Sequence, residues 1–133
     1  MIIGVPREIK PAEFRVAITP VGVRELVDHG HEVIIETEAG EGSTIHDEEY
    51  QTQGAVIVPS ADEVFGGADL VLKVKEPQAV EVPKLRSGQV LFTYLHLAAY
   101  PELAKGLLTR DIVGIAYETV QLPDHSLPLL AGG

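Results

Sequence analysis

Short apolar runs recur along the chain and predict a series of β-strands. They read IIGV, HEVIIE, AVIV, DLVLKVK, QVLFT and IVGIA, at residues 2–5, 31–36, 55–58, 69–75, 89–93 and 112–116. The runs are nearly continuous rather than alternating, which is typical of parallel strands covered on both faces. The pattern therefore predicts a sheet that is buried on both sides.

Helical patterns separate these runs. Thr19 can cap a helix whose first residue is Pro20, and Gly30 can end it after an apolar stripe at helical spacing. Three more helices are expected, one capped by Asp47 and ending at Gly54, one capped by Ser60, and one opened by Pro101. The alternation predicts an α/β fold, an open, mostly parallel, doubly wound (flavodoxin-like) sheet with helices on both faces.

Composition narrows the possible functions. A length of 133 residues favours one domain, and the absence of cysteine excludes disulfides and thiolate metal sites. The net charge of -10 repels phosphate backbones, so we expect no nucleic-acid partner. The start does not resemble a signal peptide, and no apolar run approaches the roughly 20 residues that span a bilayer. We therefore expect a cytoplasmic protein without a membrane partner.

Nucleotide and metal motifs are absent. The glycines nearest to a dinucleotide fingerprint are Gly40 and Gly42, but Ile45 stands where a third glycine is needed. No P-loop, H-E-x-x-H or G-x-S-x-G pattern occurs. His29 and His31 flank a helix end and are interpreted as solvated turn residues. We therefore expect neither a cofactor-binding residue nor a metal ligand within this chain.

Three candidate functional residues follow predicted strands. Arg15 lies in the long loop after the first strand, Lys75 ends the fourth, and His96 comes just past the fifth. Ligands of open parallel sheets bind outside the carboxyl ends of the strands. Arginine binds a carboxylate with two hydrogen bonds, lysine can hold a carbonyl or carboxylate, and histidine can exchange a proton near neutral pH. This set suits a small 2-oxo or 2-amino acid.

Structural roles for the same residues remain open at this point. A lysine at a strand end is usually a solvated rim residue, and Lys73 could be one. Lys73 and Lys75 are two positions apart, so both point to one face, which could be an exposed edge. Arg15 could simply pair with Glu13. His96, between Leu95 and Leu97, could be a hydrogen-bonded structural residue.

The stretches IGVPREIK, EFRVAITPVGV, GHEVIIETEAGEGS, LVLKVKEP, LFTYLHLAA and IAYETVQLPDHSLPLL occur in order along nearly the whole chain. In them the chain resembles the N-terminal domain of alanine dehydrogenases, a group that includes the transhydrogenase alpha subunit and saccharopine dehydrogenases. The resemblance implies that Arg15 binds the substrate carboxylate, that Lys75 contacts its carboxylate or carbonyl end, and that His96 donates and accepts the proton. It implies supporting roles for Tyr94 and Glu118.

The resemblance also implies the reaction, which is NAD-dependent, reversible oxidative deamination of L-alanine to pyruvate and ammonia by a homo-oligomer. Family members continue into a Rossmann domain that binds NAD, so we expect residues 1–133 to be a substrate-binding domain truncated before it. Transhydrogenase domains resemble this chain but lack the lysine of KVKEP and the histidine of YLHLA. The alternatives are a transhydrogenase-like domain without amino-acid chemistry, and an isolated fragment without activity.

Overall fold

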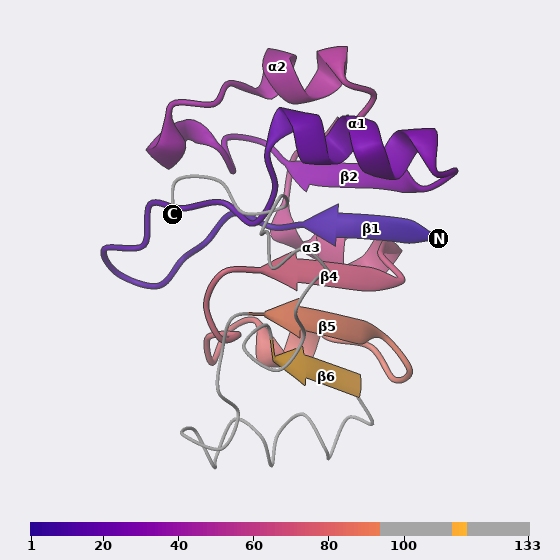
Figure 1. Cartoon of the computed structure of the whole chain (residues 1–133). Coiled ribbons are helices and arrows are strands. Elements are labelled where there is room, and N and C mark those ends of the chain that lie inside the picture. The colour runs from indigo at the N-terminus through magenta and orange to yellow at the C-terminus, as the bar shows by residue number, and fades with distance from the viewer. Residues whose placement is uncertain (94–112, 117–133) are drawn as a thin grey trace.

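The computed structural model describes residues 1–93 and the backbone of residues 113–116. Its strands form one parallel sheet in the order β3-β2-β1-β4-β5-β6 (Figure 1). The strands are β1 (Ile2–Val5), β2 (Glu32–Glu36), β3 (Val56–Val58), β4 (Leu70–Lys73), β5 (Val90–Thr93) and β6 (Val113–Ala116). Each predicted apolar run thus contains a strand.

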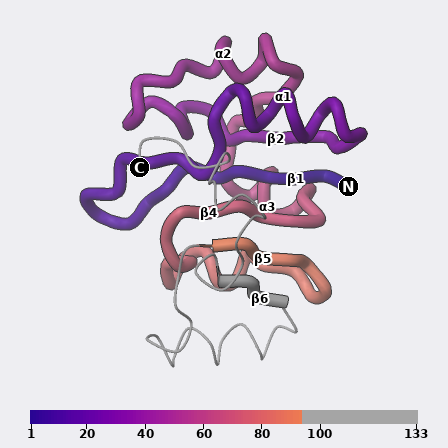
Figure 2. Tube along the Cα trace, in the orientation of Figure 1, coloured from indigo at the N-terminus to yellow at the C-terminus, as the bar shows by residue number. Residues whose placement is uncertain are grey.

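Helices cover both faces of the sheet. The α-helices are α1 (Pro20–Asp28), α2 (Asp47–Thr52) and α3 (Ala61–Gly67), and short 3-10 helices are η1 (Glu41–Ser43) and η2 (Val82–Lys84). α1 and α2 lie on one face, and α3 lies behind the sheet on the other (Figure 1; Figure 2). The predicted doubly wound α/β fold is confirmed. Among the residues described here, no helix has the length and apolar character needed to cross a membrane.

The strand order places a topological switch point between β1 and β4. The chain runs outward from β1 through β2 to β3, and then returns to place β4 on the other side of β1. This is the six-stranded order of doubly wound sheets, whereas flavodoxin itself has the order 2-1-3-4-5. The loops that follow β1 and β4 therefore start side by side, where such sheets bind ligands.

Side-chain N-caps mark the starts of α1 and α3. The Thr19 hydroxyl accepts the Gly22 N–H at 3.0 Å before α1, and the Ser60 hydroxyl accepts the Glu63 N–H at 3.4 Å before α3. Both caps are confirmed. The helix expected to open at Pro101 lies outside the described residues.

The cap predicted for α2 is wrong. His46 is the N-cap residue, and Asp47 is already the first residue of the helix. The Asp47 carboxylate accepts the Thr37 hydroxyl at 2.6 Å and the Glu38 N–H at 2.9 Å instead. Asp47 therefore ties α2 to the loop after β2, nine and ten positions earlier in the chain.

Side chains alternate along the strands between two apolar clusters. Val5, Ile35 and Leu72 face α1 and α2, whereas Val71 and Leu91 face α3. A strand covered on both faces places successive side chains in opposite cores, which explains its continuous apolar sequence. The core therefore lies on both sides of the central strands.

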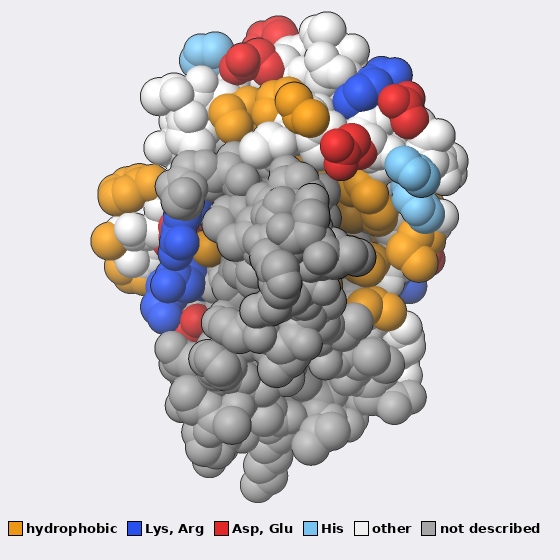
Figure 3. Space-filling model, viewed as in Figure 1, with side chains coloured by type: hydrophobic (Ala, Val, Ile, Leu, Met, Phe, Trp, Pro, Cys, Tyr) orange, Lys and Arg blue, Asp and Glu red, His pale blue; other side chains and the backbone are white. Residues whose placement is uncertain are grey.

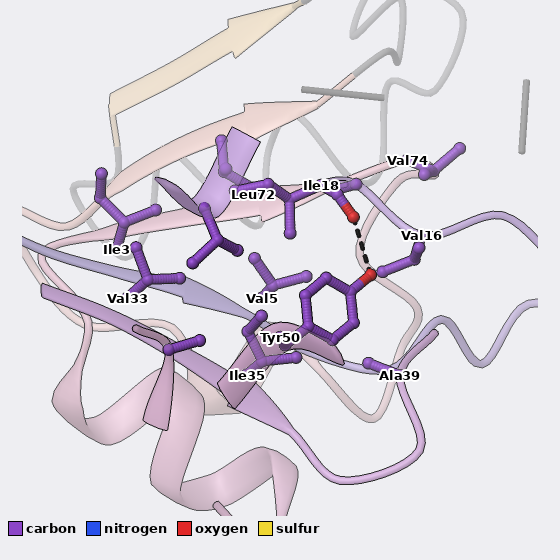
Figure 4. Close-up of a cluster of buried hydrophobic side chains, with 13 residues drawn as sticks. Ile3, Val5, Val16, Ile18, Val33, Ile35, Ala39, Tyr50, Leu72 and Val74 are labelled. Atoms are coloured by element: carbon purple, nitrogen blue, oxygen red, sulfur yellow. Dashed lines mark hydrogen bonds between the residues drawn. The ribbon is translucent and has the colours of Figure 1, made fainter. Parts of the chain in front are cut away.

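A buried tyrosine fixes the end of the loop after β1. The Tyr50 hydroxyl, on α2, donates to the Ile18 carbonyl at 2.7 Å inside the first cluster (Figure 4). Burial raises the pKa of Tyr50, so the phenol stays protonated and keeps this bond. The loop that carries Arg15 is thus fixed to the core just before α1 begins.

Candidate functional site

The loops after β1 and β4 line a pocket at the switch point. Its volume is about 470 Å³, and it is lined by Lys10, Pro11, Ala12, Glu13, Phe14, Arg15 and Lys75. In Figure 2 the loop after β1 is the indigo segment that projects beyond the carboxyl ends of the strands, and Figure 3 shows Lys and Arg side chains gathered on that side. Two predicted site residues, Arg15 and Lys75, therefore line one pocket.

Glu13 connects these two cations. Its carboxylate accepts the Arg15 Nε–H at 3.1 Å and an Arg15 Nη2–H at 2.9 Å. It also accepts the backbone N–H of Arg15 at 2.8 Å, and its Oε1 lies 4.0 Å from the Lys75 Nζ. The pairing of Arg15 with Glu13 that the sequence left open is thus present, within the pocket itself.

The charge of Glu13 is maintained despite burial. Its side chain is only 5% exposed, whereas that of Lys75 is 39% exposed. Burial acts to raise the pKa of this carboxyl, but the hydrogen bonds and positive charge of Arg15 outweigh it, with a smaller effect of Lys75, and hold the pKa below its usual value. The pocket is therefore lined by three cations, Lys10, Arg15 and Lys75, and by the anion Glu13, while Lys10 also pairs with Glu76.

A tight turn presents Glu13 to the pocket. The Glu13 N–H donates to the Lys10 carbonyl at 3.1 Å, and Ala12 has a φ of 64°. Proline at the second position and a positive φ at the third are features of a type II turn. A positive φ is unfavourable for alanine, so the contacts of the surrounding loop must hold this conformation.

The loop after β2 supports Phe14 and Arg15 from the other side. The Ser43 hydroxyl donates to the Phe14 carbonyl at 3.0 Å, and a Cβ added to Gly42 would lie 2.6 Å from that carbonyl oxygen. Only glycine at position 42 allows the two loops to approach so closely. The position of Arg15 therefore depends on this contact.

Lys73 and Lys75 have different environments. The strand β4 ends at Lys73, whose side chain is 1% exposed, so the interpretation of Lys73 as a solvated rim residue is wrong. Its Nζ lies 2.9 Å from Glu8 Oε1 and 3.3 Å from Glu81 Oε2, and both carboxylates are 2% exposed. β4 is also a central strand and not an exposed edge. Lys73 is buried because partners from other segments neutralise it.

Glu8 determines where the backbone runs after β4. Its carboxylate accepts the N–H groups of Val74 at 3.0 Å and Lys75 at 3.2 Å. Burial raises the pKa of Glu8, although the charge of Lys73 and these hydrogen bonds oppose the shift. The loop after β1 thus contacts the segment of Lys75 through Glu8 and Glu13. The sequence analysis assigned no role to Glu8, although Glu8 lies in the same long loop after β1 as the candidate residue Arg15.

The remaining predicted site residues, His96, Tyr94 and Glu118, lie outside the described residues. In the part of the chain that is described, no cluster of three or more His, Asp or Glu side chains could hold a metal ion. A dinucleotide site of this sheet type needs a glycine-rich turn after the first strand. Here Pro6, Arg7 and Glu8 follow β1, so no glycine lets the backbone approach a pyrophosphate closely. The residues of this loop do not fit the pyrophosphate of NAD.

Comparison with known proteins identifies the family of this chain. Residues 4–132 match the family model described as "Alanine dehydrogenase/PNT, N-terminal domain". An alanine dehydrogenase of Methanococcus maripaludis is 59% identical over 98% of this chain, and one of Mycobacterium tuberculosis is 56% identical over 98%.

Solved structures show the same relationship. A structure titled "L-alanine dehydrogenase" superposes with a TM-score of 0.87 at 51% identity over 96% of this chain and 35% of its own. A transhydrogenase from Sinorhizobium meliloti superposes with a TM-score of 0.84 at 32% identity, over 89% of this chain and 34% of its own. The chain spans about a third, 35%, of the length of the curated relatives that it matches. The chain thus belongs to the alanine dehydrogenase/PNT N-terminal domain family.

Proposed function

We propose that this chain is the substrate-binding domain of an NAD-dependent alanine dehydrogenase, which converts L-alanine reversibly to pyruvate and ammonia. The observation that carries the proposal is the pocket at the switch point, which Arg15 and Lys75 line together. Arg15, Lys75 and Lys10 beside Glu13 leave a net positive charge even though Lys10 pairs with Glu76, and this charge attracts a small carboxylic acid. The names of the relatives in the matched family support alanine as the amino acid.

Each proposed role follows from the chemistry of its side chain. A guanidinium carries five N–H donors, enough to hold Glu13 and a substrate carboxylate together. Lys75 would attract the carboxylate or the adjacent carbonyl oxygen as a point charge. These contacts would orient the substrate α-carbon, and such positioning can lower a barrier by several kcal/mol, up to about 7–11 kcal/mol.

The proton-transfer role is proposed for His96, with Tyr94 and Glu118 in support. A histidine near its ordinary pKa can take and return a proton as ammonia leaves or adds. NAD would accept the hydride and would be bound by the part of such an enzyme that this chain does not include. We further propose that the enzyme is a cytoplasmic homo-oligomer.

A transhydrogenase-like domain is the alternative. The superposition on the Sinorhizobium meliloti transhydrogenase is the observation in its favour. Lys75 argues against it, because a transfer of hydride between two nicotinamides needs no lysine to hold a substrate acid. Failure of the chain to bind 2-oxo acids would favour the transhydrogenase-like function.

Pyruvate binding tests the proposal in the chain itself. We expect NMR titration of the ¹⁵N-labelled chain with pyruvate to give shifts around residues 10–15 and 75, with a dissociation constant of about 1 mM, equivalent to about −4 kcal/mol. Arg15→Ala should abolish these shifts. The matched control is Arg24→Ala on α1, which removes an exposed arginine that pairs with Asp28 and lines no part of this pocket.

Two ligand controls separate pyruvate binding from general attraction of anions. Acetate carries the carboxylate without the carbonyl, and acetone carries the carbonyl without the carboxylate. We expect weaker binding of acetate and none of acetone. Identical pyruvate shifts in the parent chain and the Arg15→Ala variant would remove Arg15 from the site.

A further inference from the structure

We propose that Glu13 is a positioning residue, which fixes the side chains of Arg15 and Lys75 so that they can bind the substrate carboxylate together. This inference deepens the proposed function and rests on it for the identity of the ligand. It assigns to Glu13 no contact with the substrate. The argument depends on contacts of Glu13 that an ordinary surface ion pair lacks.

The first is the way in which Arg15 is held. Glu13 accepts Nε–H and Nη2–H from the same guanidinium, at 3.1 and 2.9 Å, and also the backbone N–H of Arg15 at 2.8 Å. Two parallel bonds from a planar group define its orientation as well as its distance. Arginine is otherwise a flexible side chain that loses much rotamer entropy when it is ordered. Glu13 therefore orders Arg15 before any ligand arrives.

The second is the position of Glu13 relative to Lys75. Its Oε1 accepts from Arg15 and lies 4.0 Å from the Lys75 Nζ, so one oxygen faces both cations. Without this negative charge the two cations would repel each other when brought together. Glu13 therefore allows both cations to line one pocket while a net positive charge remains for a monoanionic acid.

The third is the rigidity of the Glu13 backbone. The turn that begins at Lys10 fixes the Glu13 N–H, and the Ser43 hydroxyl holds the carbonyl of the next residue, Phe14. Glu13 is also buried, at 5% exposure. A carboxylate held in this way stays in place when a ligand enters.

The competing interpretation is that Glu13 occupies the place of the substrate carboxylate and is displaced by it. It contacts the same two cations that a substrate acid would contact, so distance alone does not separate the two ideas. They predict opposite effects of neutralising Glu13. Removal of a positioning residue weakens ligand binding, whereas removal of an internal competitor strengthens it.

The experiment uses the whole chain and its Glu13→Gln variant, with pyruvate as the probe. We expect the variant to bind pyruvate at least tenfold more weakly, because glutamine keeps the shape but loses the charge and one acceptor. We also expect the ¹⁵N NMR signal of the Arg15 Nε–H to shift and to exchange faster with water. Only loss of the contact to Glu13 would produce this signature. Glu25→Gln, at an exposed position of α1, is the matched control and should change neither measurement.

Glu13→Asp provides the second variant, should the glutamine variant unfold. It keeps the charge with a shorter reach, so we expect it to recover part of the pyruvate affinity. The ¹⁵N signal of the Arg15 Nε–H should lie between those of the parent chain and of Glu13→Gln. Equal or tighter pyruvate binding by Glu13→Gln, or an unchanged Arg15 Nε–H signal, would overturn the inference. If the parent chain binds no pyruvate at all, the proposed function fails. In that case the Arg15 signal still decides whether Glu13 orders Arg15.

Discussion

The ammonium of Lys73 lies 2.9 Å from the carboxylate of Glu8, although 65 positions separate the two residues. Both side chains are buried, and Glu81 supplies a second carboxylate at 3.3 Å. The pair joins the loop after β1 to the end of β4, the two segments that carry Arg15 and Lys75. The geometry of the pocket therefore depends on a buried ionic contact beneath it.

Loss of the cation should destabilise the fold strongly. Lys73→Met leaves the buried carboxylates of Glu8 and Glu81 without their cation, and we expect the free energy of unfolding to fall by about 3–5 kcal/mol. Urea denaturation followed by circular dichroism measures this change. Lys84→Met breaks the more exposed pair with Asp62 and should cost less than about 1 kcal/mol. Equal losses in the two variants would contradict the importance of the buried contact.

A methyl group at position 42 should disturb the pocket. In Gly42→Ala the new Cβ would meet the Phe14 carbonyl oxygen at 2.6 Å, so the loop that carries Arg15 must move. We expect weaker pyruvate binding, measured by NMR titration. Gly66→Ala in α3 is the matched control, because no atom outside the helix lies within 4 Å of its Cβ. This control should bind as the parent does and gain up to about 1 kcal/mol of stability, since alanine favours helix. Unchanged binding by Gly42→Ala would show that the loop adapts.

Stability should depend on pH through Glu13. Its folded pKa lies below the ordinary value of 4.5, so the ionised form stabilises the fold above about that pH, and this contribution is lost as pH falls through the lower folded pKa. We expect the free energy of unfolding to decrease more steeply below pH 4.5 in the parent than in Glu13→Gln. Glu8, whose pKa is raised, contributes the opposite trend in both proteins and cancels in the comparison. Parallel curves would show that Arg15 does not stabilise the charge of Glu13.

The hydroxyl of Tyr50 should stabilise the end of the loop after β1. Tyr50→Phe leaves the buried Ile18 carbonyl without its donor, and we expect a loss of about 1–3 kcal/mol in the free energy of unfolding. Thermal and urea unfolding both report this loss. Phe92→Leu, a volume change beside the same apolar cluster, tests whether any aromatic change has this effect. A Tyr50→Phe variant as stable as the parent would mean that Ile18 finds another donor.

Dehydrogenase activity should require more than this chain. We expect no NADH from L-alanine with the 133-residue chain, because the loop after β1 lacks the glycine-rich turn that holds the pyrophosphate of NAD. A hybrid in which this chain replaces the matching third of the Methanococcus maripaludis alanine dehydrogenase should be active. His96→Ala in that hybrid should lower kcat far more than it weakens pyruvate binding. Absorbance of NADH measures kcat, and titration with pyruvate measures binding.

Two results would change this view. Robust NADH formation by the isolated chain would show that it binds the cofactor by itself. A hybrid unaffected by His96→Ala would remove His96 from proton transfer.

The sequence alone determined the elements and their class. Strand and helix signals are local, because they depend on the periodicity of apolar residues over a few positions and on caps such as Thr19 and Ser60. Near-continuous apolar strands also indicated burial on both faces. Their positions after predicted strands then directed attention to Arg15 and Lys75, the resemblance to a family gave them roles, and both line the pocket.

Only the tertiary structure decided how these elements meet. The strand order and the burial of Lys73 depend on contacts between segments far apart in the sequence, and the diversion of Asp47 from capping depends on how the loop after β2 meets α2. The sequence shows that Lys73 and Lys75 point to one face, but a lysine is buried only where carboxylates come to neutralise it. Glu8 and Glu13 reach these lysines because β1 and β4 are neighbours in the sheet. That adjacency, absent from any local pattern, creates the pocket.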